Sequence, residues 1–377
     1  MAFDMENERL QAGIAKTRDF YAMKKNAPII QREFGYYVLD RWITEGRIKK
    51  DEDLGKLFGF DVNGMFNLGG LGWCEAAFCP EFEVEVLEDR GEYELVRDFA
   101  GRHVLYFKGR RSGFMPEYVS HPVTGWDDWE RNVKWRLAIG AEGRFDALQE
   151  NLQRSRDMAA QGAMIGQSVV GGYMYLRSLV GPEGILYMVY DAPDLVHDIM
   201  RAWFELADAV IEHHQAQVTI DELFLAEDIC YNHGALISPD MMREFLFPYY
   251  QQLITNIKRR QLDQARHLYI QIDTDGDCRP VIPLYQEIGM DHMSPFEVAA
   301  GCDVVALRKK YPQLLMRGGF DKRIIAAGKD AIDREVDRIL PFMKEQGGYI
   351  PTSDHGVPEE VNFDDYVHFR ARIREFG

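Results

Sequence analysis

Three short runs of ionisable residues each come directly after an apolar segment of the chain. The runs are Glu227-Asp228, Asp275-Gly276-Asp277 and Asp354-His355-Gly356. Imidazole and carboxylate groups are the side chains that most often move protons in catalysis. The same groups bind zinc, which accepts histidine nitrogen and carboxylate oxygen. If the three runs meet in the fold, we expect them to form a site for proton transfer or metal binding.

The segments that must position these runs alternate between strand-like and helix-like patterns from about residue 145 onward. Short apolar runs begin near residues 163, 223, 268, 290, 314 and 348. Amphipathic stretches separate them, such as residues 193–217, where apolar side chains recur at helical spacing. Strands and helices in tandem imply a parallel sheet with right-handed crossovers. We predict an α/β fold, a TIM-type (β/α)8 barrel whose strand ends carry the three runs at one mouth.

The first part of the chain must complete this barrel and also holds an insertion. We expect the two missing strands from residues 28–75 and from a segment near the insertion. Residues 81–121 contain short segments that alternate apolar and acidic positions, separated by turn-like breaks such as Asp89-Arg90-Gly91. This pattern predicts an antiparallel β-meander inserted into a single barrel domain that spans residues 1–377.

Charge and cysteine content limit the classes of partner. The chain has 44 basic and 61 acidic side chains and a formal net charge of -17. That balance argues against nucleic acid and anionic membranes as partners. No apolar run is long enough to span a membrane, and the N-terminal segment is not typical of a secretory signal. Five scattered cysteines without a Cys-x-x-Cys pair fit reduced thiols, so we expect a cytoplasmic protein.

The same polar segments resemble those of the uroporphyrinogen decarboxylase superfamily over roughly residues 145–377. The resemblance rests on residues 223–228, Ile237-Ser238-Pro239-Asp240, Asp275-Gly276-Asp277, Gly318-Gly319-Phe320-Asp321 and Asp354-His355-Gly356. It implies a TIM-type barrel with its active site at the C-terminal mouth. That family contains porphyrinogen decarboxylases, and also methyltransferases that pass methyl groups to or from a corrinoid protein.

Two features of that family are missing here. The decarboxylases carry an Arg-Gln-Ala-Gly-Arg motif whose arginines bind substrate carboxylates, whereas this chain reads Arg32-Glu33-Phe34-Gly35-Tyr36-Tyr37. The best-known zinc methyltransferases use His-x-Cys and a later cysteine, whereas this chain has Asp273-Thr274-Asp275 and Asp354-His355. The chain therefore resembles the corrinoid-dependent methyltransferase-like members more than the true decarboxylases, without their thiolate ligands.

Residue types and the resemblance together give the candidate catalytic and metal-binding residues. We assign catalytic roles to His355, Asp228 and Asp275, because an imidazole or carboxyl group can protonate a leaving group. We expect zinc, if a metal binds, to be held by Glu227, Asp275 and His355. The alternative is that Asp228 and Asp275 cap helices or pair with arginines such as Arg279.

Four aromatic residues are the candidate substrate-binding residues. Tyr173 and Tyr175 follow the strand after which the family places a substrate-binding tyrosine. Phe34 and Tyr36 belong to an aromatic group that could wall an apolar pocket for a methyl donor. Packing in the core is the alternative role for all four residues.

The function that these features favour is methyl transfer. We predict that the protein moves a methyl group from a small methylated substrate, an ether or an amine, to a separate corrinoid protein. The chain has no Asp-x-His-x-x-Gly segment for binding cobalamin, so a partner would supply the corrinoid. The alternatives are a decarboxylase of a small carboxylated substrate and a non-catalytic barrel that binds a ligand or a corrinoid protein. Because barrels of this family often pair, we also expect a homodimer.

Overall fold

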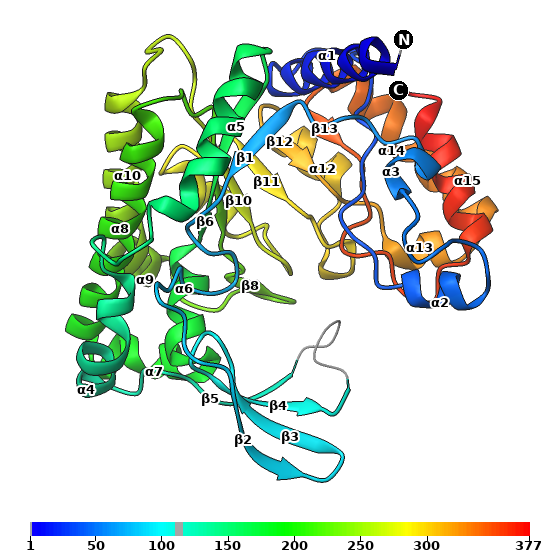
Figure 1. Ribbon diagram of the computed structural model, residues 1–377. Helices are drawn as coiled ribbons and strands as arrows, with labels where there is room; N and C mark the ends of the chain where they lie inside the picture. The colour runs from blue at the N-terminus through cyan, green and yellow to red at the C-terminus, as the bar shows by residue number, and fades with distance from the viewer. Residues whose placement is uncertain (1, 110–115) are drawn as a thin grey trace.

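The computed structural model describes residues 2–109 and 116–377 (Figure 1). The strands are β1 Met65–Leu68, β2 Glu85–Arg90, β3 Tyr93–Arg97, β4 His103–Phe107, β5 Glu117–Ser120, β6 Met164–Val170, β7 Glu222–Ala226, β8 Cys230–Tyr231, β9 Gly234–Ala235, β10 Tyr269–Asp273, β11 His292–Ser294, β12 Leu315–Arg317 and β13 Tyr349–Ile350. The α-helices are α1 Ala2–Tyr21, α2 Leu39–Thr44, α3 Leu54–Phe58, α4 Trp126–Asp128, α5 Gln149–Ala160, α6 Gly172–Val180, α7 Pro182–Asp191, α8 Pro193–Gln215, α9 Pro239–Met241, α10 Phe247–Arg260, α11 Ile282–Gln286, α12 Val304–Lys310, α13 Lys322–Ala326, α14 Lys329–Gln346 and α15 Phe363–Arg374. Short 3-10 or π turns are η1 Trp129–Val133, η2 Lys134–Leu137, η3 Asp146–Leu148, η4 Met242–Leu246 and η5 Val298–Ala300.

A curled parallel sheet forms the centre of the molecule, with helices around its outside (Figure 1). Among the described residues its seven strands follow the order β1-β6-β7-β10-β11-β12-β13. In the paired register, Asp273 at the end of β10 lies opposite Ala226 of β7 and Ser294 of β11. The C-terminal ends of these strands therefore share one edge, as the TIM-type barrel prediction requires. The prediction of that fold class is confirmed.

The seven-stranded sheet includes β1 from the predicted range 28–75, but no described strand near the insertion joins it. Within the described residues, the strands of the insertion pair only with one another, so the expectation of a barrel strand near the insertion is wrong. The extended segment 29–37 instead lies beside the chain that follows β13, at Val357. Tyr37 N donates to Val357 O at 2.8 Å, and Val357 N donates to Gly35 O at 2.8 Å. On the other side, Asp61 N donates to Gln31 O at 3.0 Å.

Helix α8 shows why the sequence pattern predicted its place. Its buried face includes Leu195, Ile199, Trp203, Leu206 and Val210, which recur every three or four residues. Burying each such side chain contributes roughly 1.5–3 kcal/mol, which holds the helix against the sheet. The short helix α9 begins after Ser238, whose hydroxyl accepts a hydrogen bond from Met241 N at 3.2 Å as an N-cap.

The inserted meander forms a separate four-stranded antiparallel sheet in the order β2-β3-β4-β5. It lies across from the C-terminal ends of the barrel strands, whereas α1 crosses the opposite end of the barrel (Figure 1). The antiparallel insertion that we predicted is therefore present, and it faces the mouth. That residues 1–377 form one domain stays a prediction. None of the described helices combines the length and the apolar character that a membrane span needs.

A candidate active site at the barrel mouth

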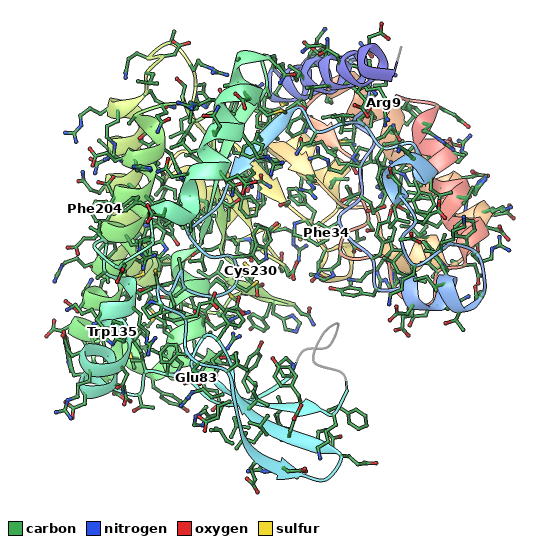
Figure 2. The ribbon with its side chains drawn as sticks, viewed as in Figure 1. Arg9, Phe34, Glu83, Trp135, Phe204 and Cys230 are labelled. Carbon is green, nitrogen blue, oxygen red and sulfur yellow. The ribbon has the colours of Figure 1, made fainter. Side chains whose placement is uncertain are left out.

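A cavity of about 780 Å³ lies between the strand ends and the inserted sheet, and we call it the mouth cavity. Its lining residues are Phe34, Tyr37, Trp73, Cys74, Glu75, Arg102, Tyr118, His121, Met174, Arg177, Ser178, Pro182, Ala226, Asp228, Asp273, Asp275 and His355. Figure 2 shows Phe34 on the side of the barrel that faces the inserted sheet. The volume suits a small organic ligand. Four predicted site residues, Phe34, Asp228, Asp275 and His355, meet in this cavity.

His355 is held between an acidic and an aromatic partner. Its Nε2 lies 3.4 Å from Asp275 Oδ2, and its Nδ1 lies 3.2 Å from the Tyr37 hydroxyl. The imidazole stacks on the Tyr37 ring with 5.6 Å between centroids, and it lies 5.4 Å from the Phe34 ring. The neighbouring Asp275 carboxylate raises the pKa of His355. The Asp275 carboxylate therefore favours the protonated form of the imidazole at the mouth of the barrel.

Asp228 reaches the cavity because the chain turns sharply after β7. Its φ of +40° lies in the left-handed region, which aspartate tolerates better than most residues. The carboxylate forms an ion pair with Arg177 at 2.7 Å. Burial nevertheless raises the pKa of Asp228. The alternative that we left open for Asp228, pairing with an arginine, is thus observed, although the partner is Arg177 and not Arg279.

Asp273 is a site residue that sequence reasoning missed. It ends β10 and lines the mouth cavity, where its Oδ1 accepts a hydrogen bond from the Ser294 hydroxyl at 2.5 Å. Burial raises the pKa of Asp273 to about 6. The signal was present in the sequence, because Asp273 begins the same acidic run as Asp275. We overlooked it because a strand's last residue can face the mouth or the surrounding helices, and the sequence does not say which.

Glu227 is not part of the mouth cavity. Its carboxyl group is fully buried, where it accepts hydrogen bonds from the Tyr250 hydroxyl at 2.6 Å and from Tyr173 N at 3.3 Å. The side chain therefore faces α10, while the next residue faces the mouth. The structure does not bring the three predicted zinc ligands Glu227, Asp275 and His355 together. Among residues 2–109 and 116–377, no three His, Cys, Asp or Glu side chains gather as a metal ion would require.

Three of the four predicted substrate-binding aromatics lie outside the cavity. Tyr173 and Tyr175 are buried in α6 with 0% and 2% of their surface exposed. The Tyr36 hydroxyl lies 2.8 Å from that of Tyr366 on the C-terminal helix α15. Tyr173 and Tyr175 lie in the core and Tyr36 packs against it, which was the alternative that we left open, and only Phe34 lines the cavity.

Other acidic residues of the predicted runs have structural roles. Asp277 pairs with Arg279 at 2.7 Å, and Asp321 caps α13 by accepting a hydrogen bond from Arg323 N. Asp354 is fully buried and accepts hydrogen bonds from Val298 N at 3.0 Å and Lys322 N at 3.1 Å. It thereby ties two neighbouring loops to the segment that carries His355.

The inserted sheet supplies one wall of the mouth cavity. Arg102, Tyr118 and His121 come from this part of the chain. Arg102 is paired with Asp98 at 2.8 Å and with Glu75 at 3.0 Å, and its guanidinium lies over the Tyr118 ring at 4.9 Å. None of these residues was predicted as a site residue, because only the folded chain places the insertion over the mouth.

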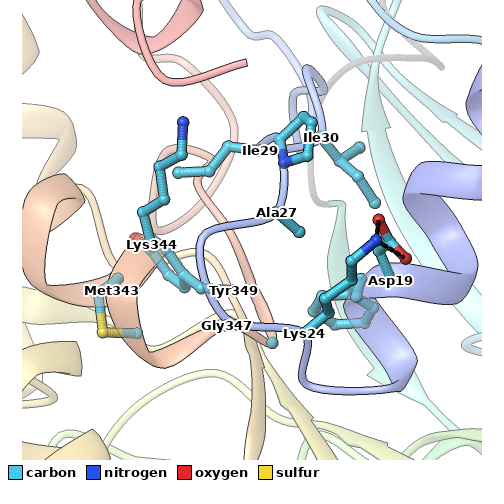
Figure 3. Close-up of a pocket in the computed structure, with 12 residues that line it drawn as sticks. Asp19, Lys24, Ala27, Ile29, Ile30, Met343, Lys344, Gly347 and Tyr349 are labelled. Carbon is cyan, nitrogen blue, oxygen red and sulfur yellow. Dashed lines mark hydrogen bonds and ion pairs between the residues drawn. The ribbon is translucent and has the colours of Figure 1, made fainter.

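A second hollow near α1 is too small for an organic ligand. It has a volume of about 20 Å³ and lies between the end of α1 and the end of α14 (Figure 3). Asp19 and Lys24 form an ion pair beside it at 2.9 Å. Such a volume holds about one water molecule. The mouth cavity is therefore the better candidate for an active site.

Known proteins are similar to this chain in sequence and in fold. Two proteins named uroporphyrinogen decarboxylase are similar over part of the chain. The one from Alcanivorax borkumensis is 26% identical over 185 residues, which is 46% of this chain and 47% of the relative. The one from Pseudomonas fluorescens (strain SBW25) is 23% identical over 191 residues, 50% of this chain and 51% of the relative. The chain thus spans about half the length of these relatives.

A solved structure and a family model match more of the chain. A structure described as a methyltransferase from Methanosarcina mazei aligns with a TM-score of 0.55 and 15% identity, and covers 96% of this chain and 98% of that chain. That likeness supports the fold. The family model for uroporphyrinogen decarboxylase (URO-D) matches residues 112–376. Because this match covers most of the chain, the protein belongs to the uroporphyrinogen decarboxylase family.

Proposed function

We propose that this protein is a methyltransferase that takes a methyl group from a small methylated amine and passes it to a separate corrinoid protein. The observation that carries this proposal is the lining of the mouth cavity. Three aspartates, Asp228, Asp273 and Asp275, face the same space as the aromatic rings of Phe34 and Trp73. Carboxylates and aromatic faces together favour a cation, and methylated ammonium groups are bound in this way.

The charge balance of the cavity supports a cationic substrate. Its two arginines are both neutralised, since Arg102 pairs with Asp98 and Glu75 and Arg177 pairs with Asp228. Asp273 and Asp275 form no ion pair with a lysine or arginine among the described residues. Asp275 has the His355 imidazole as its partner at 3.4 Å, so Asp273 is the carboxylate of the described lining without a cationic partner within ion-pair distance, and the cavity carries an excess of negative charge. The carboxylates of the cavity would attract an ammonium ligand electrostatically, whereas they would not attract a neutral ether of the same shape in this way.

The reaction needs little acid catalysis if the leaving group is an amine. When the methyl group leaves a quaternary ammonium, the carbon–nitrogen bond breaks and its electron pair stays on nitrogen. The product is a neutral amine, to which the His355 imidazolium can give its proton. Asp275 keeps that imidazolium available by raising the pKa of His355. The aromatic rings of Phe34 and Tyr37 would shield the reacting methyl group from water.

The methyl acceptor would come from a partner protein. A reduced corrinoid supplies a strong nucleophile for methyl groups, and this chain has no Asp-x-His-x-x-Gly segment to hold one. The structural neighbour from Methanosarcina mazei is described as a methyltransferase, which supports the same reaction class. Zinc has no part in the proposed reaction, because Glu227 lies apart from Asp275 and His355 in its own buried network. A cytoplasmic location and a homodimer stay predictions.

Decarboxylation of a porphyrinogen is less well supported. A substrate with many carboxylates needs several cationic side chains that are free to bind it. Proteins usually bind carboxylates with arginines, each of which donates two hydrogen bonds to one carboxylate. Here both arginines of the mouth cavity are already paired with carboxylates. We therefore do not expect uroporphyrinogen to bind at this mouth.

The proposal is tested by binding and by methyl transfer. Tetramethylammonium should bind to the purified protein in calorimetry, and a neutral isostere should bind at least about tenfold more weakly. Asp228→Asn and Asp275→Asn should weaken the binding of tetramethylammonium. Asp240→Asn, at an exposed carboxylate outside the cavity, should leave that binding unchanged. With free cob(I)alamin as acceptor, His355→Gln should slow product formation only modestly, because the imidazolium protonates the amine after the carbon–nitrogen bond has broken. Equal binding of the neutral isostere, or turnover of uroporphyrinogen, would overturn the proposal.

A further inference from the structure

A buried carboxylate joins the two chain segments that carry the aromatic and imidazole groups of the mouth cavity. Glu33 belongs to the extended segment 29–37 and does not itself line that cavity. Its side chain is 1% exposed. Its Oε1 accepts hydrogen bonds from Ser353 N and from the Ser353 hydroxyl, both at 2.8 Å, and Phe34 N donates to the same oxygen at 2.9 Å. Three donors therefore converge on one carboxylate oxygen.

The Ser353 hydroxyl extends this contact to His355. Besides Glu33 Oε1, it reaches the backbone oxygen of His355, two residues further along the chain. A hydroxyl carries one hydrogen, so it donates to one of these two oxygens at a time, while Ser353 N keeps its own bond to Glu33. The carboxylate of Glu33 is thus separated by a single hydroxyl from the backbone of the residue that we place at the mouth.

A second attachment between the two segments lies on the other side of His355. Tyr37 N donates to Val357 O, and Val357 N donates to Gly35 O, both at 2.8 Å. Between the two attachments, the His355 imidazole stacks on the Tyr37 ring with 5.6 Å between centroids. The two segments therefore run side by side, and the backbone that carries the imidazole is held at both ends.

The C-terminal helix α15 anchors Glu33 on its far side. The Tyr366 hydroxyl donates to Glu33 Oε2 at 2.9 Å, and Arg370 Nη1 lies 3.8 Å from the same oxygen. Arg370 also donates to Arg32 O at 2.9 Å and to Gln31 Oε1 at 3.1 Å. A buried carboxylate needs hydrogen bonds and an opposite charge to compensate for lost hydration, and Glu33 has both. Helix α15 thereby fixes the carboxylate in one position.

Glu33 takes the place of a missing hydrogen bond between neighbouring strands. On one side of the chain after β13, Asp354 N donates to Phe320 O at 2.8 Å, and Phe320 N donates to Thr352 O at 3.2 Å. On the other side, Ser353 N donates to Glu33 Oε1 and not to a backbone oxygen. A buried backbone N–H needs an acceptor, so without Glu33 this part of the chain must shift or lose a hydrogen bond.

We propose that Glu33 is a positioning residue that holds the His355 imidazole against Asp275. Through the same hydrogen bonds it keeps the rings of Phe34 and Tyr37 at the mouth. This inference rests on the proposed function, in which those rings surround a methylated ammonium group and the imidazolium protonates the amine product. Glu33 does this without touching the ligand. Cation–π attraction requires the ring face within about 6 Å of the cation, so a displaced segment should bind the cation less tightly.

The pKa of His355, measured by NMR titration, reports how close its imidazole lies to Asp275. Asp275 raises this pKa, and Lys322 and Glu297 also act on it and are unchanged in the variants. Glu33→Ala should lower the pKa of His355 by at least about 0.5, the change expected when a contact between two charges at the surface roughly doubles in length. Glu33→Gln keeps the size of the side chain and an acceptor oxygen, and it should largely restore the wild-type value.

A double variant separates the position of the imidazole from the charge of Glu33. If Glu33 acts by holding His355 against Asp275, Glu33→Ala should add little to the lowering that Asp275→Asn causes alone. Ser353→Ala is the milder variant, because it removes only the hydroxyl between Glu33 and the His355 backbone, and it should lower the pKa of His355 in the same direction. Ser155→Ala is the matched control. It removes an equally buried serine hydroxyl in α5, outside the mouth cavity, and should leave that pKa unchanged.

Binding of tetramethylammonium in calorimetry separates this inference from the proposed function. Glu33→Ala should weaken that binding at least about threefold, and Glu33→Gln should restore most of it. Thermal unfolding shows which variants are folded, and Ser353→Ala carries the test if Glu33→Ala does not fold.

Each outcome bears on one of the two proposals. The positioning role is refuted if the folded variants Glu33→Ala and Ser353→Ala leave the pKa of His355 unchanged, or if Glu33→Gln lowers it as much as Glu33→Ala. It is also refuted if Glu33→Ala lowers this pKa equally with and without Asp275. The ammonium site stands in these cases. If tetramethylammonium does not bind to the wild type, the proposed function fails, whereas a lowered pKa in the variants leaves the role of Glu33 at His355 standing.

Discussion

Replacing Glu227 with glutamine should make the stability of the protein less dependent on pH. Glu227 is fully buried and accepts hydrogen bonds from the Tyr250 hydroxyl and from Tyr173 N. Burial raises its pKa to about 7, so the carboxyl group holds its proton in the native state near pH 6. In the unfolded chain a glutamate has a pKa of about 4.3, so the same group is ionised there.

The magnitude follows from the difference between the two states. A pKa change of one corresponds to about 1.4 kcal/mol, so the rise at Glu227 from about 4.3 to about 7 corresponds to roughly 4 kcal/mol over the whole range. Between about pH 4.5 and 7 the native state binds a proton that the unfolded state has lost. The free energy of unfolding must therefore fall as pH rises through this range, and the loss is complete above the native pKa. Glutamine cannot ionise, and Glu227→Gln removes this contribution.

Urea unfolding at pH 5 and at pH 8 measures the effect. Between these pH values the wild type should lose about 2–3 kcal/mol more stability than Glu227→Gln. Other titrating groups, such as Asp273, change both proteins alike and cancel in the comparison. Glu244→Gln, at an exposed glutamate, should behave like the wild type. If wild type and Glu227→Gln lose stability equally with pH, the carboxyl group is not held neutral by burial.

Three further predictions concern the site and the backbone. Asp275→Asn should lower the pKa of His355, because Asp275 raises it in the native protein, and an NMR titration that shows no downward shift would contradict the contact. Gly318→Ala should cost on the order of 2–4 kcal/mol in urea unfolding, since a Cβ would meet Pro295 O at 1.8 Å at a φ of +107°. Gly289→Ala is its control, because the φ is +89° there but no atom lies within 4 Å, so only about 1 kcal/mol is expected. Chelator treatment should leave the unfolding temperature unchanged, since Asp275 and His355 form only a pair, and a marked drop would restore a metal site.

The local pattern of the sequence was enough to predict the repeated strands and helices. Apolar runs with intervening amphipathic helices predict a parallel sheet, and parallel strands bring their C-terminal ends to one edge. Asp228, Asp275 and His355 could be placed at one mouth for that reason, although more than a hundred residues separate the first from the last. The antiparallel insertion was also visible, because alternation with period two and turn residues are local signals.

The direction of each side chain was decided only by the tertiary structure. Glu227 and Asp228 are neighbours in sequence, yet the first faces α10 and the second faces the mouth, because the chain turns at Asp228 with a positive φ. Burial of Tyr173 and Tyr175 in α6 likewise depends on what packs against that helix.

Contacts between distant segments complete the site, and no local pattern encodes them. The inserted sheet closes the mouth cavity only because the folded chain places it across from the strand ends. Glu33 meets the chain that carries His355 because segment 29–37 lies beside the chain that follows β13. Periodicity specifies which residues form a strand or helix, whereas the meeting of side chains from distant segments depends on how the whole sheet curls. The acidic run and His355 were therefore predictable from the local pattern, whereas only the tertiary structure places the inserted sheet over them.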